Sequence, residues 1–286
     1  MTILYNEPMK NRSSFRTGGI ADMVILPENA EELVNALSQY KNAVILGNCT
    51  NTLVTDKGIR GVVIITADVK GLSVESDGEE GIITASCGES MSSLANFAMI
   101  NSLTGLEFLY GIPGTVGGGI YMNAGAFGGE VKDVVKEVTL FSAERGIFTL
   151  RSDQMEFGYR TSILKGKSYT VLSAAFRGKK GKRAEIEAKM NEYMASRKAK
   201  QPLEYPSCGS TFKRPEGYFA GRLIEECNLK GKAVGGAMVS TKHAGFIINY
   251  NSATSDDILK LIDCVKQTVY KAKGVMLEEE IKIIGE

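Results

Sequence analysis

The chain has 286 residues, of which 43% are hydrophobic and 23% are charged. This composition is typical of a globular protein and excludes a disordered, collagenous or fibrous chain, and the length allows one large domain or two to three smaller ones. The 34 Lys and Arg residues against 33 Asp and Glu residues leave no basic excess for nucleic acid or an anionic membrane.

The cysteines and the single histidine limit the chemistry further. Five cysteines without CxxC spacing argue against a disulfide framework and a zinc site, and His243 alone excludes a poly-histidine metal site. The longest uncharged stretch, Phe108–Gly129, contains eight glycines, which argues against a membrane span. Met1–Arg16 lacks the apolar block of a signal peptide. We therefore expect a cytoplasmic protein without metal, nucleic-acid partner or membrane insertion.

Strand patterns dominate the first 177 residues. Short apolar runs rich in β-branched residues predict strands at Met23–Leu26, Ala43–Leu46, Val62–Ile65, Ile82–Ala85, Val134–Phe141 and Tyr169–Ala175. Two segments, Asn29–Tyr40 and Ser90–Asn101, predict helices because their apolar residues recur on one face.

The pattern changes near residue 178. A short basic segment, Gly178–Arg183, precedes a polar helical run at Ala184–Arg197 that could bridge two domains. Gly217–Asn228 follows, and then the strongest helical pattern, Thr254–Lys273. Thr254 and Asp257 there resemble a capping box, and Gly274 ends the pattern. We expect a strand-rich and glycine-rich first part and an α+β final hundred residues.

Two glycine-containing segments are candidates for binding. Leu46–Thr52 follows a predicted strand, and backbone N–H groups in such a turn can bind phosphate oxygens. Taken alone, this pattern is better explained by a plain turn. It matches neither GxGxxG nor GxxxxGK[ST]. Nine of the nineteen residues of Gly111–Gly129 are Gly or Pro, which predicts a loop rather than a core element. Two such loops predict a ligand with two or more phosphates and a flat ring resting against Ile112 and Val116.

Seven motifs in order resemble one known family. They are SFRTGG at 14–19, LGNCTN at 46–51, the 111–129 segment, FGYRTS at 157–162, PSCGSTFKRP at 206–215, STKHAGF at 240–246 and the terminal EIKIIGE. Together they strongly resemble the UDP-N-acetylenolpyruvoylglucosamine reductases. The resemblance covers nearly the whole chain.

The resemblance implies an α+β fold with a two-part FAD-binding unit of the vanillyl-alcohol-oxidase (PCMH) type and a C-terminal α+β substrate-binding domain. The expected boundaries are 1–66 and 67–177 for the two FAD-binding subdomains and 178–286 for the substrate domain. It also implies FAD as cofactor and NADPH as co-substrate. Separately, we expect a monomer. The implied reaction reduces UDP-N-acetyl-3-O-(1-carboxyvinyl)-glucosamine to UDP-N-acetylmuramate, a precursor of peptidoglycan.

The resemblance also implies site residues. The cofactor-binding set is Gly47, Asn48, Cys49, Thr50, Asn51, Thr52, Gly111, Ile112, Pro113, Gly114, Thr115, Gly118, Asn123, Ala124 and Gly125. An inserted tyrosine-bearing loop found in one class of the family is missing, since only 49 residues separate Arg160 from Ser210. The resemblance therefore does not assign the residues that hold the UDP group. The substrate-binding candidates in this chain are Tyr159, Lys200, Gln201, Lys213, Arg214 and Lys242.

Three residues match the family's catalytic positions. Hydride addition to the enol ether pushes negative charge onto its carboxylate, which Arg160 can stabilise with two parallel N–H bonds. Ser210 matches the proton donor, since a positioned hydroxyl can protonate a strongly basic carbon. Cys208, an intrinsically better acid two residues away, is the rival donor. Glu280 matches the catalytic glutamate of the last strand.

Two other functions remain open on the sequence. One is an FAD-dependent oxidase of the same fold acting on another substrate. The other is a nucleotide-binding module that has lost its flavin.

Overall fold

The computed structural model describes the backbone of residues 1–286 and the side chains of residues 1–75 and 78–286. The chain forms two compact units, each built from several segments. Unit 1 comprises Met1–Leu4, Val24–Asn48 and Val62–Arg197. Unit 2 comprises Tyr5–Met23, Cys49–Gly61 and Lys198–Glu286.

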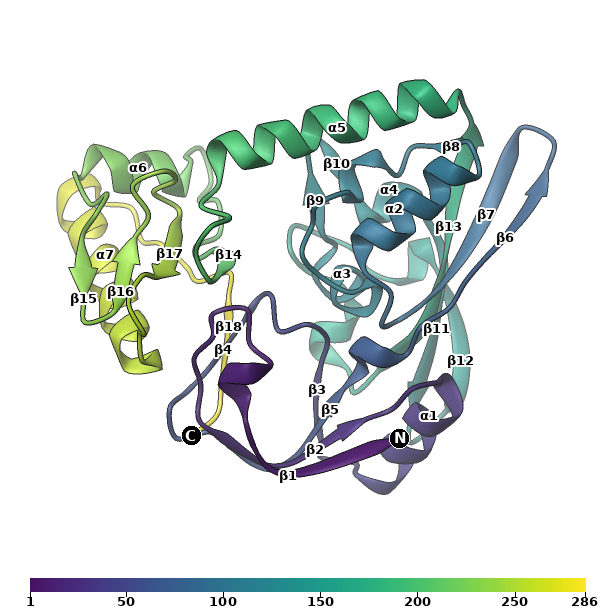
Figure 1. The fold of residues 1–286 in the computed structure, drawn as a ribbon, viewed down its shortest axis with the longest axis horizontal. Helices are drawn as coiled ribbons and strands as arrows, with labels where there is room; N and C mark the ends of the chain where they lie inside the picture. The colour runs from purple at the N-terminus through teal and green to yellow at the C-terminus, as the bar shows by residue number, and fades with distance from the viewer. The chain divides into compact units, whose positions relative to one another are not determined.

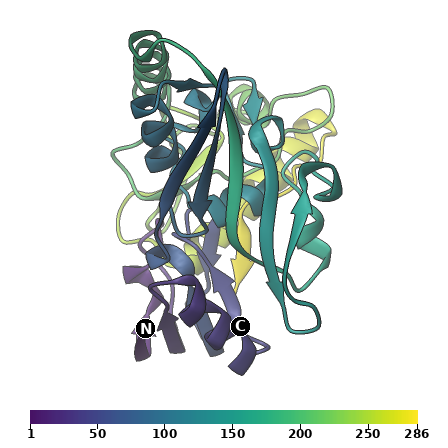
Figure 2. The ribbon, with the colours of Figure 1, turned by 90° about the vertical axis from the view of Figure 1, so that its right-hand side faces the viewer.

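A six-stranded sheet forms the centre of unit 1, and its long strands run side by side in Figure 2. The strand order is β12-β11-β13-β7-β6, and β8 also pairs with β13. Every pairing is antiparallel. The strands are β6 Leu72–Asp77, β7 Glu80–Ser86, β8 Leu103–Thr104, β11 Val135–Ser142, β12 Gly146–Arg151 and β13 Thr170–Lys180.

Unit 1 also contains helices and one short strand pair outside its six-stranded sheet (Figure 1). They are α1 Ala30–Gln39, α2 Met91–Ile100, α3 Val116–Met122, β9 Gly125–Ala126, β10 Gly129–Glu130, α4 Val131–Val134 and α5 Arg183–Lys200. The predicted first two helices are confirmed. Asn29 caps α1 by accepting from the N–H of Glu32 at 2.9 Å, and Ser90 caps α2 by accepting from the N–H of Ser93 at 2.8 Å.

The prediction that the whole segment Gly111–Gly129 is a loop is wrong. Helix α3 lies inside it, with Val116, Gly119 and Ile120 buried. A Cβ on Gly119 would come within 2.6 Å of Met91 Cε, and one on Gly117 within 3.3 Å of Cys87 Cβ. The glycines therefore serve close packing of a helix, which outweighs their poor helix propensity. Val116 is fully buried, so it offers no surface to a ring.

A second sheet has the order β1-β2-β5-β3. Its strands are β1 Thr2–Pro8, β2 Ile20–Leu26, β3 Val44–Leu46 and β5 Ile59–Ile65. β3 and β5 are parallel, with Leu46 opposite Ile65. The predicted strands at Met23–Leu26, Ala43–Leu46 and Val62–Ile65 thus exist, and β2 and β5 begin three residues earlier than predicted.

Unit 2 contains a four-stranded antiparallel sheet in the order β14-β17-β16-β15. Its elements are β14 Ser207–Ser210, α6 Ala220–Glu226, β15 Ala233–Val234, β16 Ala237–Val239, β17 Phe246–Asn249 and α7 Ser255–Lys273. Unit 2 also contains a separate two-stranded parallel sheet, formed by β4 Thr52–Val54 and β18 Lys282–Ile284. The last strand thus pairs with residues far earlier in the chain.

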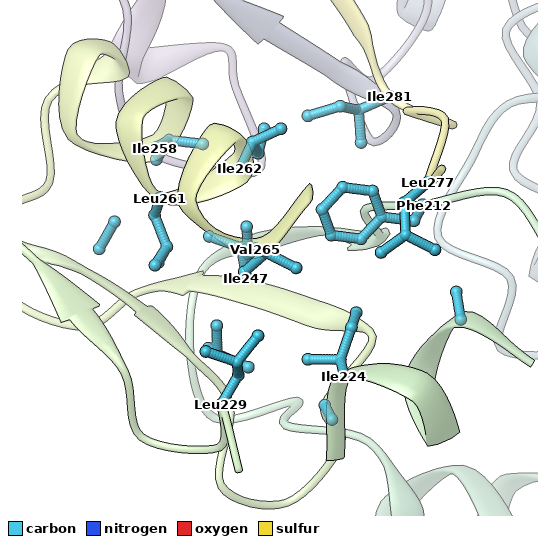
Figure 3. Close-up of a cluster of buried hydrophobic side chains, with 14 of the residues drawn as sticks. Phe212, Ile224, Leu229, Ile247, Ile258, Leu261, Ile262, Val265, Leu277 and Ile281 are labelled. Atoms are coloured by element: carbon cyan, nitrogen blue, oxygen red, sulfur yellow. The ribbon is translucent and has the colours of Figure 1, made fainter. Parts of the chain in front are cut away.

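The core of unit 2 forms along one face of α7 (Figure 3). The predicted apolar stripe is confirmed, because Ile258, Leu261, Ile262, Val265 and Val269 are all at most 3% exposed. Fully burying one such side chain contributes about 1.5–3 kcal/mol. This packing fixes α7 against the sheet that carries Ser210.

The ends of α7 also follow the sequence. Thr254 Oγ1 accepts from the N–H of Asp257 at 3.1 Å, and Asp257 Oδ2 accepts from the N–H of Thr254 at 3.0 Å. Gly274 ends the helix with φ 68°, which costs glycine little. The predicted capping box and stop are both confirmed.

The two compact units do not coincide with the expected boundaries at residues 66 and 177. Residues 5–23 and 49–61 belong with the C-terminal segment, and unit 1 continues through most of α5 to Arg197. The reason is packing: Ile186, Met190 and Arg197 of α5 are buried. The composition changes at residue 178. Unit 1 nevertheless extends to Arg197, because one face of this polar helix is buried.

Candidate active site

The two predicted flavin-binding segments meet within unit 1. Gly47 follows β3, and a Cβ placed on it would collide with Oγ1 of Thr115. Thr115 is 1% exposed and caps α3. Only a glycine at position 47 allows this approach, so the two segments pack directly against each other.

The second segment supplies fewer free donors than a phosphate-binding loop would. The N–H groups of Ile112 and Gly114 donate to Leu109 and Ile112 carbonyls at 3.1 and 3.0 Å. Those of Val116 and Gly117 donate to the carbonyls of Glu89 and Cys87 at 2.7 and 2.8 Å. A ligand could therefore approach the backbone of this segment closely, but these N–H groups already donate hydrogen bonds within the protein.

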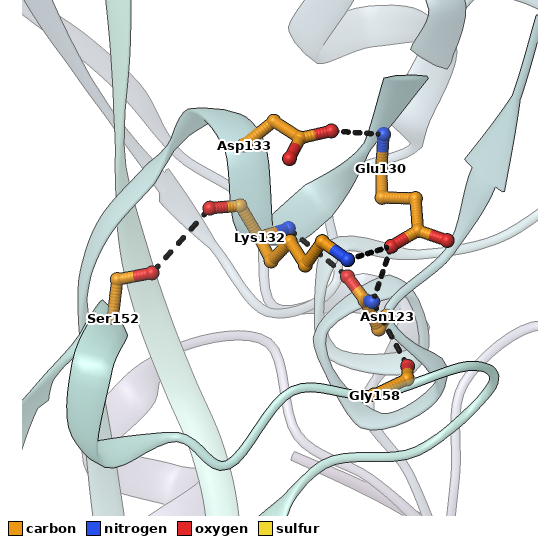
Figure 4. Close-up of polar contacts among 6 residues, drawn as sticks. All are labelled: Asn123, Glu130, Lys132, Asp133, Ser152 and Gly158. Atoms are coloured by element: carbon orange, nitrogen blue, oxygen red, sulfur yellow. Dashed lines mark hydrogen bonds and ion pairs between the residues drawn. The ribbon is translucent and has the colours of Figure 1, made fainter. Parts of the chain in front are cut away.

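Asn123 ends α3 in the left-handed conformation, with φ 44°. Its buried amide Nδ2 donates to Glu130 Oε2 and to the carbonyl of Gly158, both at 3.0 Å (Figure 4). Its Oδ1 accepts from the N–H of Lys132 at 3.0 Å. Both donors of the amide are thus used within the protein, and Asn123 connects the glycine-rich segment to the turn that carries Arg160.

Arg160 stands in a turn with φ 54°. Strained backbone of this kind persists where the surrounding structure determines it, often at functional sites. The N–H of Gly158 donates to the carbonyl of Thr161 at 3.1 Å, which closes the turn. The pKa of Glu130 is lowered, mainly by its hydrogen bond with the Lys132 ammonium and to a smaller extent by the charge of Arg160. Arg160 is half-buried.

In unit 2 the first candidate loop continues through Cys49–Thr52. Ser14 Oγ donates to the carbonyl of Cys49 at 3.1 Å, and Cys208 Sγ donates to the carbonyl of Thr52 at 3.2 Å. Cys49 itself has φ 50°, and burial raises the pKa of its thiol to about 11. The loop is therefore fixed through its carbonyls, and its cysteine stays a neutral thiol.

Cys208 is a poor proton donor in this structure. It is 2% exposed, and burial raises the pKa of its thiol to about 12. Gly209 has φ 75°, and the pairing of β14 with β17 shifts register between Ser207 and Ser210. Such a bulge changes the direction of neighbouring side chains. Cys208 therefore faces the core, whereas Ser210 is half-buried and accessible.

Ser210 and Glu280 lie in adjoining backbone segments. The N–H of Glu280 donates to the carbonyl of Thr211 at 2.8 Å, and the N–H of Lys213 donates to the carbonyl of Glu278 at 2.8 Å. Asn51 Nδ2 also donates to the carbonyl of Glu280 at 3.1 Å. Unit 2 thus brings together one residue of the predicted flavin loop and both predicted catalytic residues of the C-terminal part.

The three consecutive glutamates differ in their surroundings. Glu278 pairs with Lys213 at 2.9 Å, and Glu279 pairs with Lys266 at 2.8 Å. The hydrogen bond with the Lys213 ammonium lowers the pKa of Glu278. Glu280 is half-buried. Its backbone N–H donates to the carbonyl of Thr211, the residue that follows Ser210.

The predicted substrate residues are placed less distinctively. Lys242 Nζ donates to the carbonyl of Lys198 at 2.8 Å, and Arg214 lies 4.0 Å over the ring of Phe219. With Lys213 paired to Glu278, these cations already have partners within unit 2. The exposed Lys200 and the half-buried Gln201 belong to unit 2, and the exposed Tyr159 belongs to unit 1.

Two residues with positioning roles were missed from the sequence. Ser14 holds the carbonyl of Cys49, and Thr211 binds both the N–H of Glu280 and, through Oγ1, the N–H of Ile247 at 3.1 Å. Both fall inside the motifs SFRTGG and PSCGSTFKRP. The signal was therefore present, but nothing in a motif distinguishes a side chain that contacts a ligand from one that holds a neighbour.

Unit 2 also has a pocket of about 550 Å³. Lys10, Arg16, Asp56, Asn249 and Thr254 are among its lining residues. Neither Ser210 nor Glu280 is, so this pocket is separate from the candidate catalytic residues.

Comparison with known proteins defines the class. A model described as "FAD binding domain" matches residues 21–150. The chain therefore carries the binding domain of an FAD flavoprotein, and FAD is its cofactor.

The remainder of the chain identifies the family. A second model, "UDP-N-acetylenolpyruvoylglucosamine reductase, C-terminal domain", matches residues 201–284. The proteins of that name from Caldanaerobacter subterraneus and Clostridioides difficile are each 48% identical to this chain, covering 98% and 99% of it and 93% and 94% of their own lengths. The chain belongs to the UDP-N-acetylenolpyruvoylglucosamine reductase family.

A solved structure of the family supports the fold. The reductase from Thermus caldophilus is 31% identical, with a TM-score of 0.84 over 99% of this chain and 98% of its own. The expected α+β fold, with an FAD-binding unit and a C-terminal substrate domain, is thereby confirmed. Across the described residues, the structure contains no helix that is both long and apolar enough to span a membrane.

Proposed function

We propose that this chain reduces the enolpyruvyl ether UDP-N-acetyl-3-O-(1-carboxyvinyl)-glucosamine to UDP-N-acetylmuramate, with FAD as cofactor and NADPH as electron donor. Membership of the reductase family over nearly the full chain supports the reaction. The observation that carries the residue assignment is the hydrogen bond from the Glu280 N–H to the Thr211 carbonyl, which supports a role for the two C-terminal catalytic candidates in adjoining segments.

Close packing of the two glycine-containing segments in unit 1 supports a role for them in holding the cofactor. Gly47 approaches Thr115 so closely that a methyl group there would collide with it. In unit 1, Gly47, Asn48, Gly111–Thr115 and Gly118 would hold FAD, and the family resemblance assigns Cys49–Thr52 the same role. Bound there, FAD would supply the hydride-transfer chemistry that links NADPH to the methylene carbon of the substrate. The remaining predicted cofactor contacts are Asn123, Ala124 and Gly125. The side-chain amide of Asn123 already makes hydrogen bonds within the protein.

Each catalytic side chain has one role. Arg160 binds the substrate's carboxylate, where negative charge develops as hydride arrives, and stabilises that charge with its planar pair of donors. Ser210 Oγ donates its proton to the neighbouring carbon of the former double bond. The half-exposed position of Ser210, compared with the buried thiol of Cys208, supports the serine as donor.

Glu280 acts beside Ser210. Its carboxyl group lies in the segment that Thr211 and Asn51 hold, where it can orient the serine hydroxyl or hold a proton near the substrate. A carboxyl next to a bound carboxylate tends toward its protonated form, because two close like charges raise one pKa. Lys200, Gln201, Lys213, Arg214, Lys242 and Tyr159 remain candidate ligands for the UDP-sugar.

The proposal is tested by separating the two half-reactions. Purified protein is reduced anaerobically with NADPH, and reoxidation of the flavin is then followed after adding the enolpyruvyl substrate. We expect reduction by NADPH and rapid reoxidation by this substrate. A protein that takes up FAD but is reoxidised only by oxygen would instead be an oxidase. A protein that takes up no FAD would contradict both enzymatic functions.

We further expect the protein to act as a monomer in the cytoplasm, where its nucleotide substrates are found. Light scattering during size-exclusion chromatography measures the mass directly. A mass well above 30.9 kDa at micromolar concentration would contradict the monomer.

A further inference from the structure

Arg197 is a buried cation that the proposed mechanism does not use. Its side chain lies in unit 1, where the residue is 7% exposed. Among the residues whose side chains are described, neither Nε nor Nη2 has a hydrogen-bond partner. Burial lowers the pKa of the guanidinium. An unpaired buried charge of this kind costs folding free energy, and native proteins rarely keep one without a use.

Its neighbours explain how the charge is tolerated but do not satisfy its donors. Arg197 lies in the last turn of α5 (Arg183–Lys200), where the helix dipole favours a cation. Its Cζ lies 5.1 Å from the ring centre of Phe127, and that ring stacks on Tyr193 at 4.2 Å with 2° between the planes. An aromatic face attracts a cation, yet it leaves the two N–H groups unpaired.

The guanidinium also lies against the candidate cofactor segment. A Cβ on Gly111 would come within 3.0 Å of Arg197 Cδ and 3.1 Å of its Nε. Met194 Cε lies 2.8 Å from the same position. Gly111, with φ 79°, therefore allows the backbone of the segment to touch the arginine side chain.

We propose that Arg197 binds the N1–C2=O edge of the flavin ring, with Nε and Nη2 as donors. Addition of hydride brings two electrons and one proton into the ring, so this edge gains negative charge on reduction. A fixed cation then stabilises the reduced ring more than the oxidised ring. The inference rests on the proposed binding of FAD by the Gly111 segment.

The surroundings favour a ring over a phosphate as the acceptor. Phe127, Met194 and the bare backbone of Gly111 form an apolar, partly flat environment around the guanidinium. A flat ring fits such surroundings, whereas a doubly charged pyrophosphate would lose hydration there and gain a single cation. The pyrophosphate is therefore the alternative that the experiment must distinguish.

The test compares Arg197→Met with Arg183→Met, which removes an exposed arginine from the same helix. The midpoint potential of bound FAD is measured in both, together with the dissociation constants of oxidised and reduced FAD. We expect Arg197→Met to weaken binding of reduced FAD about tenfold more than binding of oxidised FAD. For a two-electron couple this corresponds to a potential about 30 mV lower. Arg183→Met should keep the wild-type potential.

Thermal unfolding of the apoproteins provides a second readout. Because Arg197 is an unpaired buried charge without its ligand, we expect apo Arg197→Met to melt at a higher temperature than apo wild type. FAD should then raise the melting temperature of the variant less than that of wild type. A purely structural arginine would show the opposite result, with a less stable apoprotein and an unchanged potential.

Two further variants keep the test decisive. Arg197→Lys retains the charge and should hold the potential closer to wild type than Arg197→Met does. Arg197→Gln provides the potential if Arg197→Met retains no flavin. Equal weakening of both redox states, with an unchanged potential, would overturn the proposal and indicate the pyrophosphate. A wild-type protein that binds no FAD would instead overturn the proposed function itself.

Discussion

Asn51 Nδ2 donates a hydrogen bond to the main-chain carbonyl of Glu280 at 3.1 Å, across 229 positions of sequence. The N–H of Lys282 returns a bond to the carbonyl of Asn51 at 2.9 Å. The predicted cofactor loop and the segment carrying the candidate glutamate therefore hold one another in unit 2. A disturbance of the loop should reach Glu280 even where cofactor binding survives.

We predict that Asn51→Ala slows the second half-reaction about fivefold. One hydrogen bond contributes about 1 kcal/mol, and about 1.4 kcal/mol at the barrier would be a factor of ten. Single-turnover reoxidation by the enolpyruvyl substrate measures the effect, with exposed Asn251→Ala as control. Wild-type reoxidation in fully flavinated Asn51→Ala would contradict the positioning role.

Ser210→Ala should leave reduction of the flavin by NADPH nearly unchanged and slow the second half-reaction by several orders of magnitude. The loss should exceed the roughly 10² to 10⁴ typical of a general acid, because the buried Cys208 cannot substitute. Cys208→Ser is the matched control and should reoxidise at nearly the wild-type rate. If Cys208→Ser were as slow as Ser210→Ala, the thiol would be the donor.

Arg160→Lys should slow reoxidation roughly 10- to 100-fold, since a hydrogen bond to a charged group is worth about 1.5–3 kcal/mol. A lysine presents a point charge and cannot reproduce the planar pair of donors. Stopped-flow measurements at saturating substrate isolate this step. Arg151→Lys, at an exposed arginine paired with Asp153 at 3.1 Å, serves as control. Near-normal turnover of Arg160→Lys would remove this residue from the site.

Gly47→Ala should weaken FAD binding to the apoprotein by roughly 10- to 100-fold. The added methyl group collides with Thr115, and overpacking of this kind costs about 1–3 kcal/mol. Fluorescence titration with FAD measures the affinity. Gly166→Ala adds the same methyl group where nothing lies within 4 Å and should bind FAD normally. Equal affinity in both variants would show that the Gly47–Thr115 contact does not shape the site.

Asp257 predicts a pH-dependent contribution to stability. Hydrogen bonds from the backbone N–H groups of Thr254 and Gly236 lower its pKa. A carboxyl with a lowered folded pKa stabilises the protein above its unfolded pKa of about 3.9, and the contribution disappears as pH falls through the folded value. Urea unfolding should show wild type more stable than Asp257→Asn at pH 7. The difference should shrink below about pH 4, and a constant difference down to about pH 2 would contradict this account.

Local signals in the sequence predicted most of the regular structure. Helix α7 shows why: its apolar spacing, its capping pair Thr254 and Asp257, and Gly274 all act within a few residues of the helix. The family motifs likewise indicated Ser210 and Glu280. Their placement in adjoining segments, however, depends on the carbonyl of Thr211, and no spacing in the sequence reveals a backbone hydrogen bond between segments so far apart.

The errors came from packing at long range. Gly117 and Gly119 were interpreted as loop residues because glycine is a poor helix former, but α3 needs them where it meets Cys87 and Met91. Arg197 was interpreted as part of a polar helix. Its burial beside Gly111 and Phe127 results from partners elsewhere in unit 1, which helical periodicity alone does not contain.

The parallel pairing of β4 with β18 has a consequence for synthesis of the protein. Leu53 pairs with Ile283, so β4 has no strand partner on that side until β18 has been translated. Contacts between such distant positions form slowly, and an unpaired strand edge invites association with other chains. A message that stops short of Glu280 would release a product that lacks this glutamate and leaves β4 open. In the cell, pairing of β4 therefore waits for the synthesis of β18.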